Sequence, residues 1–183
     1  MKIPPGQITT TKFPTMTFGS TPEINLDSWE LKIFGLIQEE IILKWSDLQK
    51  LPKYKLLSDF HCVTQWSKMN NEWEGILVST LFESLNKKDL SDNIMVHCYG
   101  GYTTNVQYST LIRHKGILAY KHNQQTLKPE HGGPLRLILP ERYAWKSAKW
   151  INGLEFTQNN NPGFWESRGY HMEGDPWKQQ RFE

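Results

Sequence analysis

The chain has 183 residues, of which 38% are hydrophobic and 22% charged, and its formal net charge at pH 7 is +2. This length fits a single domain that can bury a core without disulfide bonds. The small charge argues against a nucleic-acid partner, and no apolar run approaches the roughly 18 residues that a membrane-spanning helix needs.

The N-terminal half predicts an arm followed by short elements. Residues 1–25 are rich in Thr, Pro and Gly and are expected to form an extended arm without the apolar region of a signal peptide or a twin-arginine pair, which favours a cytoplasmic protein. Alternating apolar residues predict a strand over residues 29–35, which Gly35 ends. Ser46 is a candidate N-cap for a short helix through Lys50. Residues 54–60 are a candidate strand leading into Cys62.

The second half continues with short elements. Ser79 and Ser109 are candidate N-caps of two further helices. Strands are expected at three places along this half: residues 94–98, 117–120 and 135–139. Residues 158–183 are turn-rich and aromatic and are expected to wrap the surface. Because the elements lack a regular βαβ rhythm, we expect a single domain over residues 1–183 of the α+β class, with mixed β-sheets and short helices.

The two cysteines, Cys62 and Cys98, are 36 residues apart. A disulfide between them is not expected in a reducing compartment, so each is either a small buried side chain or a reactive or metal-binding thiol. His61 precedes Cys62 and His97 precedes Cys98, which raises the alternative of a zinc site. Neighbouring residues on a strand point to opposite faces, however, and this disfavours two adjacent ligands to one ion.

The segment from His131 to Trp150 is the most basic part of the chain and suits a phosphate group. Guanidinium and ammonium donors bind phosphate well, particularly beside hydroxyl and backbone N–H groups. Arg136 lies within an apolar strand, where an unpaired charge is costly, so it is expected to have an anionic partner. The chain contains no P-loop, dinucleotide-binding or G-x-S-x-G motif, which argues against those classes of site.

Several separated segments together resemble the sulfite oxidase superfamily of molybdopterin enzymes, in particular its small cytoplasmic sulfite oxidase-like branch. They occur in the family's order and span roughly residues 10 to 181. The segments are DFHCVTQWS at 59–67, WEG at 73–75, GYTTN at 101–105, HGGPLRL at 131–137, YAWKSAKWI at 143–151, PGFWE at 162–166 and GDPW at 174–177.

The resemblance implies a sulfite oxidase-type fold and a mononuclear molybdenum held by one molybdopterin and a cysteine thiolate. Cys62 matches the position of the metal ligand and catalytic cysteine, whereas Cys98 matches no ligand position and is expected in the core. A thiolate is a soft ligand suited to such a metal. The other candidate cofactor-binding residues are Phe13, Pro14, Thr104, His131, Arg136, Lys146, Ser147, Ala148 and Lys149.

The reaction that the resemblance implies is a two-electron oxygen-atom transfer on a small substrate, either a sulfoxide, an N-oxide or a sulfite-like anion. Some relatives carry an arginine where this chain has Gln65, which weakens the case for sulfite. Tyr99, Tyr102, Tyr170 and His171 are candidates to gate the site. Without a C-x-x-C-H haem motif, electrons are expected to come from, or go to, an external protein.

Two alternatives to an enzyme remain open at the level of sequence. The first is a non-catalytic pterin-binding or interaction module on the same fold. The second is a β-rich binder of single-stranded nucleic acid that uses Trp and Lys side chains, which the small net charge disfavours.

Overall fold

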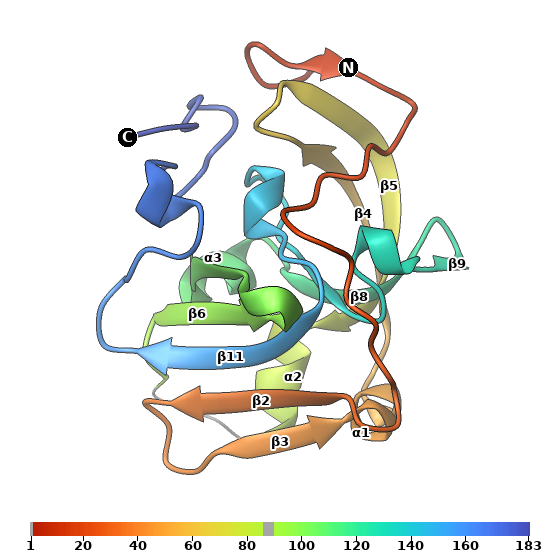
Figure 1. Ribbon diagram of the computed structural model, residues 1–183, viewed down its shortest axis with the longest axis vertical. Coiled ribbons are helices and arrows are strands. Elements are labelled where there is room, and N and C mark those ends of the chain that lie inside the picture. Colours follow the sequence, from red (N-terminus) through yellow and green to blue (C-terminus); the bar gives the residue numbers. More distant parts are fainter. Residues whose placement is uncertain (1, 86–89) are drawn as a thin grey trace.

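The computed structural model describes residues 2–85 and 90–183. Its strands form two mixed sheets (Figure 1). In the first sheet, β1 runs parallel to β5 and the other neighbouring strands are antiparallel. This sheet contains β1 (Ile8–Thr9), β4 (Tyr54–His61), β5 (Trp66–Leu77), β8 (Ile117–His122), β9 (Gln125–Thr126) and β10 (Arg136–Ile138).

The second sheet has the strand order β3-β2-β11-β6-β7, and β11 runs parallel to β2 and antiparallel to β6. Its strands are β2 (Glu30–Gly35), β3 (Ile41–Lys44), β6 (Asn93–Cys98), β7 (Thr103–Gln107) and β11 (Ile151–Thr157). Mixed sheets with short helices confirm the expected α+β class.

In the described ranges, three short α-helices each follow a strand without a loop between them. They are α1 (Trp45–Lys50), α2 (Val78–Ser84) and α3 (Tyr108–Arg113). The expectation that Ser46, Ser79 and Ser109 cap these helices was wrong, because the N-cap is the residue that ends the preceding strand: Lys44, Leu77 and Gln107.

At α1 and α3 the side chains that replace the expected caps are aspartates. The Asp47 carboxylate accepts a hydrogen bond from the Lys44 backbone at 3.1 Å, which satisfies a donor at the start of α1. At α3 both the backbone N–H and the hydroxyl of Ser109 donate to Asp92, at 2.6 and 2.9 Å. At α1 and α3 carboxylates therefore take the place of serine caps, whereas at α2 the Val78 N–H donates to the Gly116 carbonyl at 2.9 Å.

Strands β8 and β10 lie between two hydrophobic cores, and their side chains alternate between them. In β8, Leu118 packs in the larger core, which also contains β2, β6, β11 and α2, whereas Ile117 and Ala119 pack in the smaller one. In β10, Ile138 belongs to the smaller core. Because strand residues two apart share a face, Arg136 lies on that side as well. The Arg136 guanidinium therefore lies on the side of the sheet that faces the cavity described below.

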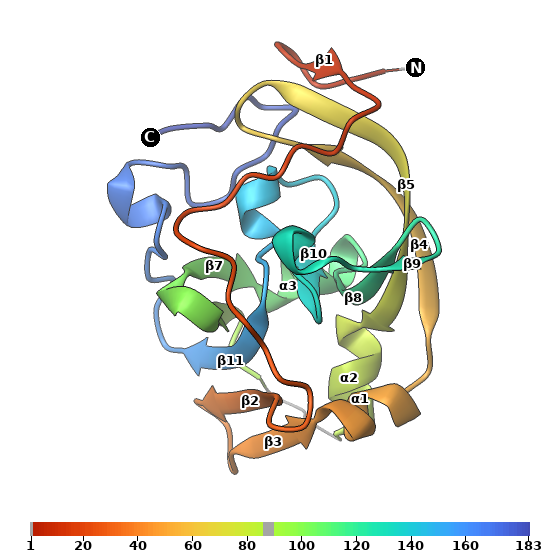
Figure 2. The ribbon, with the colours of Figure 1, turned by 45° about the vertical axis from the view of Figure 1, so that its right-hand side comes forward.

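The hairpin formed by β4 and β5 is the longest feature of the first sheet (Figure 1, Figure 2). Strand β4 matches the candidate strand over residues 54–60, whereas β5, a strand of 12 residues, was not expected from the sequence. Its register with β8 shifts between Glu74 and Gly75. A Cβ on Gly75 would lie 2.0 Å from the Leu118 carbonyl oxygen, so only glycine fits this bulge. The turn of the hairpin carries Cys62.

Residues 2–25, here called the arm, and residues 158–183, here called the C-terminal segment, contain little regular secondary structure. The arm passes in front of the two sheets, in red and orange in Figure 2, and only Ile8 and Thr9 of its residues form a strand. The C-terminal segment packs beside the arm, where an Arg181 Nη2 donates to the Pro5 carbonyl at 3.5 Å. Within residues 2–85 and 90–183, no helix has the length and apolarity needed to cross a membrane.

Candidate functional site

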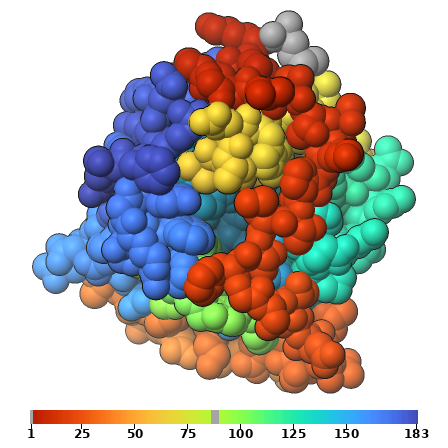
Figure 3. Space-filling model, turned by 45° about the horizontal axis from the view of Figure 1, so that its top comes forward, coloured from red at the N-terminus to blue at the C-terminus, as the bar shows by residue number. Residues whose placement is uncertain are grey.

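A cavity of about 350 Å³ opens between the N-terminal arm, the turn before β5 and the C-terminal segment. Figure 3 shows the opening between these segments, in red, yellow and blue. The structure brings eight of the ten candidate residues from the sequence to its wall: Phe13, Pro14, Cys62, His131, Arg136, Ser147, Ala148 and Lys149.

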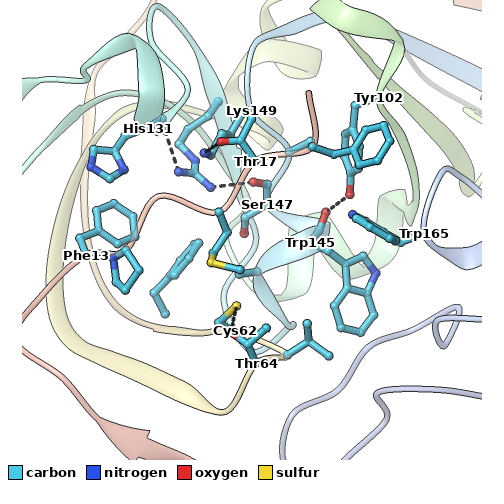
Figure 4. Close-up of a pocket in the computed structure, with 18 of the residues that line it drawn as sticks. Phe13, Thr17, Cys62, Thr64, Tyr102, His131, Trp145, Ser147, Lys149 and Trp165 are labelled. Atoms are coloured by element: carbon cyan, nitrogen blue, oxygen red, sulfur yellow. Dashed lines mark hydrogen bonds between the residues drawn. The ribbon is translucent and has the colours of Figure 1, made fainter. Parts of the chain in front are cut away.

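Cys62 begins the tight turn between β4 and β5. Its backbone N–H donates to the Trp66 carbonyl at 2.8 Å, and its carbonyl accepts from the Gln65 N–H at 3.1 Å. Gln65 takes the left-handed conformation that closes the turn, with a φ of 71°. The thiol Sγ lies at the floor of the cavity, and the Thr64 hydroxyl donates to it at 3.1 Å (Figure 4). The cysteine is thus aimed into the cavity from a rigid hairpin.

A chain of buried hydrogen bonds supports this turn from behind. The Gln7 amide donates to the Cys62 carbonyl at 3.1 Å, and the Ser67 hydroxyl donates to the Gln7 amide oxygen at 3.1 Å. Since the Ser67 proton is used there, the His61 Nδ1–H is the donor in the 2.7 Å contact with Ser67 Oγ. Burial lowers the pKa of His61, which favours this neutral ring. The N-terminal segment therefore helps to hold Cys62 in place.

The positive charges gather on one side of the cavity. The Arg136 guanidinium donates to the His131 carbonyl at 2.7 Å and to the Ser147 carbonyl at 2.8 Å. It also lies over the rings of Phe60 and Trp73. Burial lowers the pKa of Arg136 to about 9, which still leaves it charged at neutral pH. No acidic side chain is among these contacts, so an anionic partner would have to come from a bound group.

Lys149 adds a second cation beside Arg136. Its ammonium donates to the Glu130 carbonyl at 2.6 Å and to the Thr17 hydroxyl at 3.0 Å. Burial and then the charge of Arg136 lower the pKa of Lys149 to about 7. Gly132 makes this approach possible: its φ is 103°, and an added Cβ would lie 3.0 Å from side-chain carbons of both Arg136 and Lys149.

The donors on this side fit a bound anion. Among the buried side-chain nitrogens of the described residues that have no hydrogen-bond partner, His131 Nδ1 and Arg136 Nε belong to residues of this side of the cavity. The described cavity wall contains neither Asp nor Glu. A buried, uncompensated pair of cations with free donors is costly unless a negative group binds there. Phe13 stacks flat on the ring of His131 at 4.5 Å and closes the same side. A phosphate-bearing organic group matches these features.

The opposite side of the cavity is aromatic, and we call Tyr102, Trp145, Trp165 and Tyr170 the aromatic wall. Figure 4 shows Tyr102, Trp145 and Trp165 across the cavity from Phe13 and His131, with Cys62 between the two sides. The rings of Trp165 and Tyr170 stack at 5.0 Å. The Tyr102 hydroxyl donates to the Trp145 carbonyl at 2.6 Å, and burial raises the pKa of Tyr102 well above its usual range. This wall is therefore neutral.

Thr104 and Lys146 are the two candidates that the structure does not bring to the cavity. Both side chains are buried behind the aromatic wall, where they contact Glu166. Lys146 Nζ lies 2.6 Å from Glu166 Oε1, which also accepts hydrogen bonds from Thr104 and Trp145 at 2.8 and 2.9 Å. Burial lowers the pKa of Lys146, while Glu166 acts in the opposite direction. These residues anchor the wall instead of lining it.

Of the candidate gating residues, Tyr102 and Tyr170 line the cavity, whereas Tyr99 and His171 do not. Cys98 lies in the larger core, as expected, and burial raises the pKa of its thiol. In the described parts of the chain, no three His, Cys, Asp or Glu side chains are grouped as metal ligands. Several lining residues were not among the candidates, including Thr64, Trp145 and Trp165, although all three lie within the quoted motifs.

Comparison with known proteins identifies a family model that matches residues 18–165, described as an oxidoreductase molybdopterin binding domain. "Uncharacterized oxidoreductase YuiH" of Bacillus subtilis (strain 168) is 41% identical over 182 residues, which cover 99% of this chain and 92% of that protein. The "Protein-methionine-sulfoxide reductase catalytic subunit MsrP" of Campylobacter jejuni is 28% identical over 160 residues. This alignment covers 78% of the present chain but only 54% of the relative.

Among solved structures, the sulfane dehydrogenase SoxCD of Paracoccus pantotrophus has a similar fold, with a TM-score of 0.68 at 19% identity. The likeness covers 76% of this chain and 40% of the SoxCD chain. This likeness shows that the chain shares the fold of that structure, in agreement with the family that the motifs indicate.

Proposed function

Because the chain belongs to the family of oxidoreductase molybdopterin binding domains, we propose that Cys62 is the protein's ligand to its molybdenum. Membership makes the protein a molybdopterin-dependent oxidoreductase with a molybdenum–molybdopterin cofactor. The proposal for Cys62 is supported by its place at the cavity floor and by the softness of a thiolate ligand. When bound, the cofactor supplies two-electron redox chemistry and the site of oxygen transfer.

The basic side of the cavity is suited to hold the pterin and its phosphate. Arg136 supplies positive charge at neutral pH, Lys149 adds an ammonium donor whose charge a bound anion would stabilise, and His131 Nδ1 is a free polar atom on the same side. Phe13, stacked on His131, excludes water from there. Ser147, Ala148 and Pro14 line the same cavity and complete the proposed contact set. Thr104 and Lys146 instead contact Glu166 behind the aromatic wall.

We propose that the substrate is a small neutral sulfoxide or, less well matched, an N-oxide. The observation that carries this proposal is the separation of charge: the lining cations, Arg136 and Lys149, belong to the basic side, and the aromatic wall carries none. A sulfite dianion would need cations converging on it. Gln65, at the position where some relatives carry arginine, is not part of the cavity wall. Sulfur packs favourably against aromatic rings, which suits an organic sulfoxide.

The proposed net reaction takes a sulfoxide, two electrons and two protons to a thioether and water. The electrons come from an external carrier protein, and the aromatic wall holds the organic groups and limits the water around them. The printed name of the Campylobacter relative describes a methionine sulfoxide reductase, which supports the same substrate class.

This proposal is tested by turnover with reduced artificial electron donors on dimethyl sulfoxide, methionine sulfoxide and trimethylamine N-oxide, beside sulfite oxidation with an acceptor. We expect the sulfoxides to be reduced fastest. Trp165→Leu removes an aromatic face and should raise KM for a sulfoxide by about tenfold, the effect of roughly 1.4 kcal/mol. Phe34→Leu, on the second sheet outside the cavity, is the matched control. Faster turnover of sulfite than of every sulfoxide would refute the assignment.

We also propose that residues 1–183 act as one unit in the cytoplasm. The arm and the C-terminal segment supply Phe13 and Tyr170 to the cavity, which supports a single unit. Both cysteines are free, as is usual in a reducing compartment. Fractionation of cells that express the chain tests the compartment, and recovery from an extracytoplasmic fraction would contradict it.

A further inference from the structure

The hydroxyl of Thr64 is placed on the sulfur of Cys62. Thr64 Oγ1 donates to Cys62 Sγ at 3.1 Å, and among the described residues it is the one donor that forms a hydrogen bond with this sulfur. Thr64 itself lines the cavity (Figure 4). Nothing in the binding of the pterin or the packing of the aromatic wall requires a hydroxyl at this position.

The turn holds this hydroxyl in place. The Cys62 carbonyl accepts from both the Gln65 N–H and the Gln7 amide, each at 3.1 Å, and the Cys62 N–H is bound to the Trp66 carbonyl. Both ends of the four-residue link are thereby fixed to β5 and to the N-terminal segment. Because the backbone of this turn is already fixed, the Thr64 side chain loses little conformational entropy when its hydroxyl stays near the Cys62 sulfur.

A hydrogen bond to a coordinating sulfur changes the metal to which it is bound. The donor withdraws electron density from the thiolate, so the thiolate gives less of it to the metal. This stabilises the more electron-rich, reduced state, and hydrogen bonds to ligand sulfur tune reduction potentials in this way at other metal centres. Because Arg136 donates to two carbonyls and Lys149 to a carbonyl and a hydroxyl, their hydrogen bonds do not reach the sulfur.

We propose that Thr64 is a tuning residue that raises the reduction potential of the molybdenum through its hydrogen bond to Cys62 Sγ; the proposal rests on Cys62 being the metal ligand. Thr64 thereby sets the balance between the two half-reactions of the enzyme. A higher potential eases the transfer of electrons from the external carrier and lowers the driving force for oxygen removal from the substrate.

The test is a spectroscopic redox titration of molybdenum in three holoenzymes: wild type, Thr64→Val and Thr64→Ser. Valine keeps the shape of threonine and removes the donor, whereas serine keeps the donor. We expect valine to lower the midpoint potential, with a roughly tenfold shift in the equilibrium between the oxidised and reduced forms, or about 30 mV for a two-electron couple. Serine should restore the wild-type value. Thr126→Val makes the same change on the exposed strand β9 and should leave the potential unchanged.

A valine variant with the wild-type potential, or a serine variant whose potential falls with that of valine, would overturn the proposal. If valine prevents retention of the metal, Thr64→Ala removes the same donor with a smaller side chain and is titrated in its place; failure of both variants to retain metal while serine retains it would show a structural role and also overturn the proposal. The molybdenum content of the wild type distinguishes failure of the proposed function from failure of the Thr64 proposal. Wild-type protein without molybdenum refutes the proposed function, whereas metal-replete variants with unchanged potentials refute only the role of Thr64.

Discussion

The cost of burying the Lys149 charge on the basic side of the cavity can be measured in cofactor-free protein, from the pH dependence of its stability. The pKa of Lys149 is lowered from 10.5 to about 7, because its ammonium is buried beside Arg136. Below pH 7 the lysine is charged in both the folded and the unfolded protein, and folding bears the full desolvation cost. Between about pH 7 and 10.5 only the unfolded state keeps the proton, so this contribution to the free energy of unfolding increases with pH. The cost disappears above 10.5.

The perturbation is Lys149→Met, which keeps an unbranched side chain and removes the charge. The pKa shift corresponds to about 3.5 kcal/mol between pH 7 and 10, and solvent in the open cavity reduces this to about 1–2 kcal/mol. The difference in the free energy of unfolding, variant minus wild type, is therefore expected to be about 1–2 kcal/mol more favourable to the variant at pH 7 than at pH 10.

The assay is urea unfolding of cofactor-free wild type and Lys149→Met at both pH values. Methionine cannot make the hydrogen bonds of Lys149 to Glu130 and Thr17. Lysine can make them whether it is charged or neutral, so their loss changes the stability difference between the two proteins equally at each pH. All other titrating groups are common to both proteins. An identical stability difference at pH 7 and pH 10 would refute the reasoning about uncompensated charge.

Two further predictions concern the support behind the aromatic wall. Glu166→Gln should destabilise the protein by about 3–5 kcal/mol, because it leaves the Lys146 ammonium buried without its counter-charge. In urea unfolding, Asp47→Asn at an exposed pair is the control, and an equal loss in both variants would contradict this role. Gly163→Ala should cost about 1–3 kcal/mol, since its Cβ would lie 2.5 Å from the Thr104 Cα. Unchanged thermal unfolding of this variant would show that the segment can move aside.

The fold was predictable where burial gives a regular pattern. Strands β8 and β10 are aliphatic runs between two cores, so their sequences indicate strands directly. Strand β5 was missed because it buries polar residues: Ser67 and Asn71 are both fully buried and are satisfied by hydrogen bonds, including one from the Asn71 amide to the Lys68 carbonyl at 2.7 Å. Such partners are not visible in a hydrophobic pattern.

The site was predictable to the extent that short motifs carry it. Cys62, His131 and Arg136 each lie in a motif of neighbouring residues, and all three reach the cavity. The sequence offered only Tyr102 and Tyr170 of the aromatic wall, as candidates to gate the site. The wall as a unit was not predictable, because contacts such as that between Trp145 and Tyr170 join distant segments. The basic segment shows the same limit, because its two lysines face different partners: Lys149 lines the cavity, whereas Lys146 contacts Glu166 behind it.

The turnover and molybdenum content of Cys62→Ser, measured beside Cys98→Ser, test the central claim most directly. Wild type and Cys98→Ser should each carry about one molybdenum per chain and turn over a sulfoxide, because Cys98 only packs in the larger core. Cys62→Ser should keep its fold, as judged by circular dichroism, and lose turnover. A metal-replete and fully active Cys62→Ser protein would contradict the assignment of Cys62 as the molybdenum ligand.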